Sequence, residues 1–212
     1  MSQDNILLET QFFPTIQYMS ALIQHPSVIL EKYEHFQKGT YRNRCQIATA
    51  QGTQTLSVPL KKGKNNQQII SDVQIANDTH WQRSFWRTLQ TAYGNAPYWE
   101  HYAPIIEPLF LKKQTYLFEY NLDILQTILK IFKLDKSISL SFTDVYIPVF
   151  RDGTSQNNRE GVDFRNKCTD KSEGNIHNRY HQVFEDRHGF LPNLSILDLL
   201  FCCGKQSLDI LI

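Results

Sequence analysis

The sequence predicts an α/β protein in which a strand-rich N-terminal part with a β-hairpin is followed by a helical block and a C-terminal helix. Three observations predict this class. Short apolar runs rich in β-forming residues fill the first third of the chain. In the middle third, apolar and aromatic residues recur every three or four positions, as on one face of a helix. The last third ends on a buried apolar run that stops at Gly204.

A strand that ends abruptly before a helix opens the chain. Pro14 removes a backbone donor and biases Phe13 away from the helical region, so a helix is predicted just after residues 6–13. Ligands of α/β proteins usually bind at the carboxyl ends of strands, and Gln11 and Tyr18 lie at this turn. Because no glycine-rich loop is present there, side chains are expected to recognise the ligand, which argues against a P-loop or dinucleotide fingerprint.

The next predicted elements are an apolar strand at 27–31, a hairpin of 43–50 and 54–60, a basic loop at 61–66 and a strand at 69–75. Gly52 at the centre of the alternating segments favours the hairpin. Pro59 restricts the second hairpin strand to an edge or to its own end.

Three helices are predicted in the middle of the chain. The first begins after a cap at Asp78 or Thr79 and ends at residues 94–97, the second covers 98–110 with weak points at Pro104 and Pro108, and the third covers 115–132. The third has the widest apolar face, which makes it the clearest helix of the sequence.

The stretch from Arg151 to Arg179 changes character. It is rich in polar residues and holds few apolar ones, so it is predicted to be a flexible loop or lid. A short strand at 180–184 and a buried terminal helix at 195–201 follow. The whole chain, residues 1–212, is predicted to form a single domain.

Composition narrows the function classes. The 212 residues are 41% hydrophobic and 12% aromatic, enough for a substantial core. A net charge of +1 removes any general electrostatic case for binding nucleic acid or an acidic membrane. The amino terminus lacks a basic region followed by a hydrophobic run, and no segment approaches the roughly 18 apolar residues of a membrane span. A cytoplasmic protein without membrane insertion is therefore expected.

The cysteines and histidines predict no metal site. Cys45, Cys168, Cys202 and Cys203 lack CxxC spacing, and they are interpreted as small core residues of a reducing compartment. The histidines and carboxylates take no ligand spacing such as HExxH. The sequence identifies no cofactor.

One polar cluster precedes the predicted hairpin. Lys38, Tyr41, Arg42, Asn43 and Arg44 lie within seven residues, and guanidinium groups make planar, two-point contacts with phosphate or carboxylate. The cluster therefore favours a small anionic ligand such as a nucleotide or sugar nucleotide. A solvated basic edge of the hairpin is the alternative.

Two further clusters complete the candidate site. Gln11, Pro14 and Tyr18 mark the first turn, either as ligand-binding residues or as a capped turn with a half-buried tyrosine. Near the C-terminus, Tyr180 and His181 precede a charged segment that contains Arg187. His181 is a candidate general base near neutral pH, although a histidine in a strand is more often structural.

These clusters lie in segments that resemble the WbqC-like family of bacterial proteins, in the form common among Bacteroidetes. The segments are QFFPTIQY (11–18), KGTYRNRCQI (38–47), LSVPLKKG (56–63), HWQRSFWRTLQTAYGNAPYWEHY (80–102) and YHQVFEDRHGFLPNLSILDLLFCCG (180–204). The similarity covers most of the chain, and GFLPNLSILDLL is its most specific part. Longer members carry a serine-rich strand end and a glycine-tyrosine motif before the terminal segment. This chain has Ser139, Ser141 and then the polar stretch instead.

Family members are often encoded among genes for surface-polysaccharide synthesis, such as that of O-antigen. The resemblance therefore implies a cytoplasmic protein that modifies sugar-nucleotide precursors, as an amino-acyl or acyl transferase.

Two function classes follow. As an enzyme, the protein would bind its anion with Lys38, Arg42 and Arg44, hold a polar group with Gln11 and Tyr18, and use His181 as base. As a non-catalytic accessory protein, it would bind a nucleotide or sugar nucleotide without turnover. Both hypotheses place the segments around Gln11, Arg42 and Tyr180 in one pocket, and two proton-transferring groups beside the anion would distinguish the enzyme.

Overall fold

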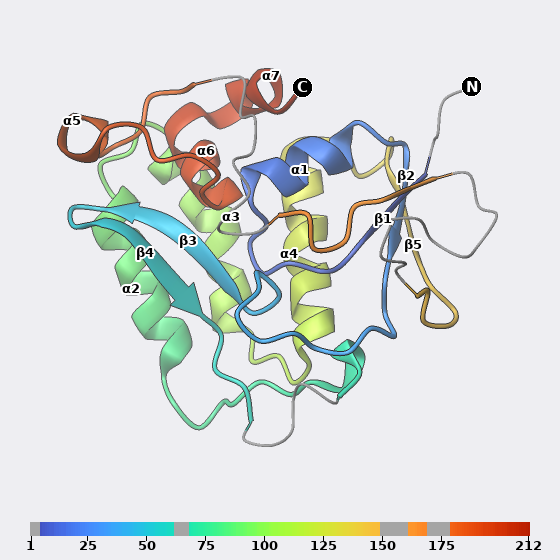
Figure 1. The fold of residues 1–212 in the computed structure, drawn as a ribbon. Coiled ribbons are helices and arrows are strands. Elements are labelled where there is room, and N and C mark those ends of the chain that lie inside the picture. Colours follow the sequence, from blue (N-terminus) through green and yellow to red (C-terminus); the bar gives the residue numbers. More distant parts are fainter. Residues whose placement is uncertain (1–4, 62–67, 149–160, 169–178) are drawn as a thin grey trace.

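The computed structural model describes residues 5–61, 68–148, 161–168 and 179–212, and it confirms the predicted α/β class (Figure 1). A sheet of four parallel strands has the order β5-β2-β1-β6. Its strands are β1 (Asn5–Leu8), β2 (Ser27–Leu30), β5 (Ser139–Phe142) and β6 (Gly161–Asp163). The two central strands are almost wholly apolar because helices and loops cover both faces of a parallel sheet.

The order of the strands defines a switch point between β1 and β6. The helix α1 (Ile16–Ile23) connects β1 to its neighbour β2, and the chain later adds β5 on the far side of β2. It then crosses to the opposite side of β1 to form β6. In open α/β sheets, ligands bind outside the carboxyl ends of the strands at such a reversal.

The β-hairpin is confirmed as a separate two-stranded sheet of β3 (Arg44–Thr49) and β4 (Gly52–Ser57). Gly52 adopts a φ of +102° at its turn, a conformation that favours glycine. The predicted helical block is also confirmed, as α2 (Trp81–Tyr93), α3 (Trp99–Leu111) and α4 (Leu117–Ile131). Figure 1 shows α2 beside the hairpin and α4 nearer the parallel sheet.

The C-terminal part contains α5 (Glu185–His188), α6 (Ile196–Cys203), η3 (Gly204–Gln206) and α7 (Ser207–Leu211). As predicted, α6 is buried and ends at Gly204. Among the described residues, no helix combines the length and the apolar character that crossing a membrane requires.

Three local predictions are wrong. Residues 69–75 form the 3-10 helix η2 (Ile70–Asp72) instead of a strand, because Ile70 and Val73 bury their side chains three positions apart. Residues 180–184 form no strand, since the chain turns there into α5. The residue at the start of α2 is His80, not Asp78 or Thr79, and it caps the helix without a side-chain hydrogen bond.

The prediction of a loop from Arg151 to Arg179 is wrong for residues 161–163, which form a strand, whereas residues 164–168 form no helix or strand and the remainder lies outside the described residues. Residues 161–163 pair with β1 as β6, and Arg165 and Cys168 are buried. The low apolar content of this segment does not reveal that it is ordered, because parallel pairing with β1 and the buried ion pairs of Arg165 hold it in place.

Candidate functional site

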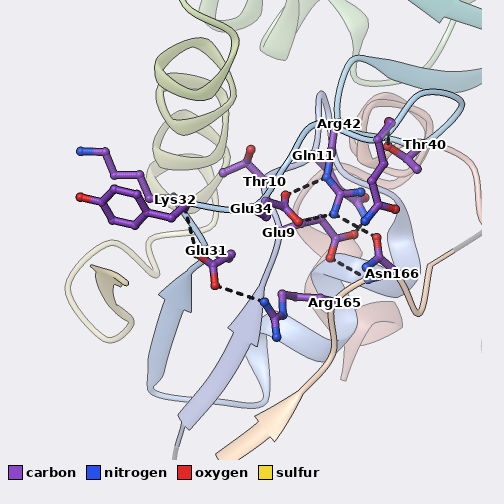
Figure 2. A network of polar contacts seen from close by, with 12 residues as sticks. Glu9, Thr10, Gln11, Glu31, Lys32, Glu34, Thr40, Arg42, Arg165 and Asn166 are labelled. Carbon is purple, nitrogen blue, oxygen red and sulfur yellow. Dashed lines mark hydrogen bonds and ion pairs between the residues drawn. The ribbon is translucent and has the colours of Figure 1, made fainter. Parts of the chain in front are cut away.

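Charged side chains gather at the carboxyl edge of the parallel sheet. Glu9 directly follows β1, Glu31 directly follows β2, and Arg165 and Asn166 follow β6. Because the ends of parallel strands meet at one edge, these side chains lie close together (Figure 2). Glu9, Glu31 and Arg165 are each less than 5% exposed, although charged residues are rarely buried unless they are paired.

The ion pair of Arg42 with Glu34 forms one half of this network. The Nε and Nη2 atoms of Arg42 donate to the two carboxylate oxygens of Glu34 at 2.7 and 2.6 Å, and Nη2 also donates to Asn166 Oδ1 at 2.9 Å. Burial raises the pKa of Glu34, and the Arg42 guanidinium partly reverses that shift. Burial lowers the pKa of Arg42, but the bonds and charge of Glu34 outweigh it, so the guanidinium stays charged.

Arg165 organises the other half. Its Nε and Nη2 atoms donate to the two oxygens of Asp163 at 3.0 and 2.7 Å, while Nη1 reaches Glu31 at 3.1 Å. Glu31, which is fully buried, also accepts from the hydroxyl of Thr143 at 2.7 Å and the N–H of Ile147 at 3.0 Å. This half therefore ties together the segments that follow β2, β5 and β6.

Glu9 connects the halves to the first turn. Its carboxylate accepts from Gln11 Nε2 at 3.0 Å and from the backbone N–H of Asn166 at 2.9 Å. The hydroxyl of Tyr18 donates to the Glu9 carbonyl at 2.8 Å. Gln11 and Tyr18, which the sequence singled out, thus converge on Glu9.

The network holds more carboxylates than cations: four carboxylates, of Glu9, Glu31, Glu34 and Asp163, surround the two guanidinium groups. They do not form a metal site, because the described residues contain no group of three or more ligating side chains placed to hold an ion.

A cavity of about 440 Å³ opens beside the network. Its lining residues are Glu34, His35, Phe36, Gln37, Lys38, Tyr146, Arg165 and Asn166. Lys38 and His35 are exposed, whereas the Glu34 carboxylate and the Arg165 guanidinium form a buried polar wall. This cavity places Lys38 in a ligand-sized space at the edge where α/β sheets bind ligands.

Other residues of the Lys38–Arg44 segment tie the loop to the hairpin. The hydroxyl of buried Tyr41 donates to Gln46 at 3.2 Å, and Asn43 Nδ2 donates to the carbonyl of Val58 at 3.1 Å. The guanidinium of Arg44 lies 5.8 Å from the centre of the Tyr41 ring. These side chains lie outside the lining of the cavity.

Tyr180 belongs to a second buried network, centred on Asp198 of α6. The Asp198 carboxylate accepts from the hydroxyls of Tyr180 at 2.6 Å and Tyr93 at 2.8 Å, and from Gln182 Nε2 at 3.1 Å. Burial raises the pKa of Asp198, and these donors partly lower it. The hydrogen bonds of Gln11 and Arg42 thus centre on Glu9 and Glu34, whereas those of Tyr180 centre on Asp198.

His181 lies at the surface. Its side chain is 78% exposed, and its Nδ1 atom is 3.5 Å from Glu185 at the start of α5. Arg187 is also exposed, on the same short helix. Neither residue lines the cavity beside the sheet, so their roles in binding or catalysis stay predictions.

The terminal GFLPNLSILDLL segment supports the first turn. The hydroxyl of Ser195 donates to the carbonyl of Phe13 at 3.0 Å, and the N–H of Ile196 donates to that of Pro14 at 2.7 Å. Asn193 accepts from the N–H of Gln17 at 3.0 Å. Phe13 has a φ of +42°, unusual for a bulky residue, so the C-terminal segment holds a strained turn beside the site.

Sequence reasoning missed most of the buried charges. Glu9, Glu31, Glu34, Arg165 and Asn166 were not singled out, although a glutamate directly after each apolar strand was a usable signal. Arg165 and Asn166 were hidden because the surrounding composition is that of a loop.

Comparison with known proteins gives one family and one relative. The sequence profile of the WbqC-like protein family matches residues 10–148. The chain is also 24% identical over 223 residues to the uncharacterized protein Rv1507c of Mycobacterium tuberculosis, covering 97% of this chain and 96% of that protein. No solved structure matches significantly.

Proposed function

This chain belongs to the WbqC-like protein family, and from that premise we propose that it transfers an acyl or amino-acyl group to an amino-sugar or sugar-nucleotide precursor of a bacterial surface polysaccharide. The observation that carries the proposal is the cavity at the carboxyl edge of the sheet. There, the exposed cation Lys38 lies beside an imidazole, His35, and a buried carboxyl group, Glu34.

Lys38 is the residue proposed to attract the anionic part of the substrate. An ammonium group on a flexible stem binds phosphate as a point charge. Arg42 supports the site from behind, because its guanidinium fixes Glu34 and Asn166, which both line the cavity. Arg42 is thus assigned to positioning the wall that faces the anion, in place of the direct contact with the anion expected from the sequence.

The transfer itself requires one base. The amine nitrogen of the acceptor attacks the carbonyl carbon of the acyl donor, the bond from that carbon to the leaving group breaks, and the proton lost by the amine passes through the base to the leaving group. Among the residues that line the cavity, His35 and Glu34 are the ones proposed to carry that proton. His181 remains the base that the sequence predicted, and it would have to act from outside the cavity lining.

A second candidate function is binding without turnover. It is favoured by the buried ion pairs, because carboxylates hold the guanidinium groups of Arg42 and Arg165 in place. Such a rigid wall would suit an accessory protein that recognises a nucleotide or sugar nucleotide.

The test is a thermal-shift screen of nucleotides, sugar nucleotides and acyl donors, followed by incubation of each hit with an amino-sugar acceptor. A ligand at a hundred times its Kd stabilises the folded state by about 2.7 kcal/mol, which is a measurable shift. A new acylated sugar in the mass spectrum is the result expected of the transferase. Binding without product would support the accessory function, and stabilisation by none of the three classes would contradict both.

A further inference from the structure

A second cavity, of about 450 Å³, lies against α2 and α3 and shares no lining residue with the first. Its lining residues are His80, Gln82, Arg83, Trp86, Arg87, Gln90, Glu107, Phe110, Leu111 and Lys113. The volume is in the range of small-molecule sites. Most of this lining comes from the HWQRSFWR segment and the residues just after it, which the site beside the sheet does not use.

Three cations border this cavity. Arg83 and Arg87 are exposed and lie four positions apart on α2, so they share one face of the helix, and Lys113 follows α3. The lining holds a single carboxylate, that of Glu107. Unlike Arg42 and Arg165, these three cations take part in no ion pair within the described part of the chain. Their charge is therefore available to a ligand.

The inner wall of the cavity is apolar and firmly packed. Trp86 and Phe110 are 9% and 5% exposed, and their ring centres lie 5.6 Å apart. Trp86 also stacks on Trp99, and their ring centres lie 5.2 Å apart. Leu111 is 75% exposed and supplies further apolar surface.

A polar detail adds to this picture. The indole N–H of Trp86 is buried without a hydrogen-bond partner in the described part of the chain. A buried donor without an acceptor is unfavourable.

We propose that this second cavity binds a phosphorylated small molecule whose uncharged part is apolar. Arg83, Arg87 and Lys113 hold the phosphate, because guanidinium groups make charge-assisted two-point contacts with phosphate oxygens. The uncharged part packs against Phe110 and Leu111. A bare phosphate ion would leave that wall uncovered, so a phosphate ester binds more tightly than inorganic phosphate.

The test uses isothermal titration calorimetry with phenyl phosphate, inorganic phosphate and phenol. Phenyl phosphate should bind the parent protein, and more tightly than either fragment. Arg87→Gln removes one charged two-point contact and should weaken phenyl phosphate binding at least about tenfold. Two control variants are Arg187→Gln, at an exposed position on α5, and Lys38→Ala, in the other cavity. Both should leave the affinity within about twofold, because substitutions at distant sites act independently.

Several outcomes would overturn the proposal. They are an absence of phenyl phosphate binding to the parent protein, an unchanged affinity in both Arg83→Gln and Arg87→Gln, or a loss of affinity in Lys38→Ala alone. Since the substituted arginines are exposed, matching thermal unfolding curves should confirm that each variant is folded.

Discussion

The backbone N–H of Asn166 donates to the carboxylate of Glu9 at 2.9 Å and so joins the loop after β6 to the residue after β1. The side chain of the same asparagine accepts from Arg42 at 2.9 Å. One residue thus connects the Glu9 carboxylate to the Arg42–Glu34 ion pair across the switch point of the sheet. This connection fixes one wall of the proposed substrate cavity.

Arg42→Lys should destabilise the fold although it preserves the charge. A lysine ammonium cannot bond both oxygens of Glu34 and the side chain of Asn166 as the planar guanidinium does. Leaving buried polar groups without partners costs about 1–3 kcal/mol, so urea unfolding should show a loss of that size. Arg187→Lys, on the exposed α5, is the matched control and should change the unfolding free energy by less than about 0.5 kcal/mol. Equal stability of the two variants would contradict the structural role of Arg42.

Asp198→Asn should remove a pH dependence of stability. Burial raises the pKa of Asp198, so the folded protein keeps its proton at a pH where the unfolded chain, with a pKa of about 3.9, has lost it. The stability that this group contributes is fully present below about pH 3.9, the pKa of the unfolded chain. It is lost as the pH rises through the raised pKa of the folded protein. The stability of the parent relative to Asp198→Asn should therefore fall as the pH increases from about 4.

Urea unfolding of both proteins from pH 4 to pH 8 measures that difference. The buried Glu34 carboxyl group, whose pKa is also raised, contributes equally to both proteins and cancels. A difference that stays constant or grows with pH would show that the pKa of Asp198 is not raised.

Gly204→Ala should be more destabilising than Gly189→Ala. Both glycines have positive φ, +58° and +70°, so both alanines are strained by about 1–3 kcal/mol. A Cβ at Gly204 would also lie 2.5 Å from the ring of Tyr98, whereas a Cβ at Gly189 would meet no atom within 4 Å. Thermal unfolding of the pair separates the two effects, and equal losses would argue against the close approach of Tyr98.

The sequence predicted elements whose pattern is local. The turn at Pro14, the hairpin about Gly52 and the helix ending at Gly204 each depend on the conformational preferences of a few neighbouring residues. The helices α2 to α4 followed from an apolar face that repeats every three or four residues.

Features that depend on distant partners were not predictable in this way. The strand β6 is defined by its pairing with β1, more than 150 residues earlier in the chain. In the same way, the burial of Arg42 is explained by Glu34 and Asn166, and that of Asp198 by Tyr93 and Tyr180. From local sequence, a buried arginine and a solvated one look alike.

The choice of base is tested by His35→Ala and His181→Ala once a transferred product is found. A general base contributes about a hundred- to ten-thousand-fold in rate, so the true base should lose that much in kcat while substrate still binds. The cavity lining favours His35. A large loss in His181→Ala with normal turnover by His35→Ala would instead restore the base that the sequence predicted.

The most direct measurement of the central claim is the affinity of the best sugar-nucleotide ligand for the parent protein, Lys38→Ala and Lys136→Ala, by isothermal titration calorimetry. Lys38 lines the cavity at the carboxyl edge of the sheet, whereas Lys136 is exposed just before β5, at the opposite edge. A hydrogen bond to a charged group contributes about 1.5–3 kcal/mol to binding. Its loss in Lys38→Ala should therefore weaken binding about tenfold or more relative to the parent protein. Lys136→Ala should bind as the parent does. Equal affinities for all three proteins would contradict the assignment of this cavity as the substrate site.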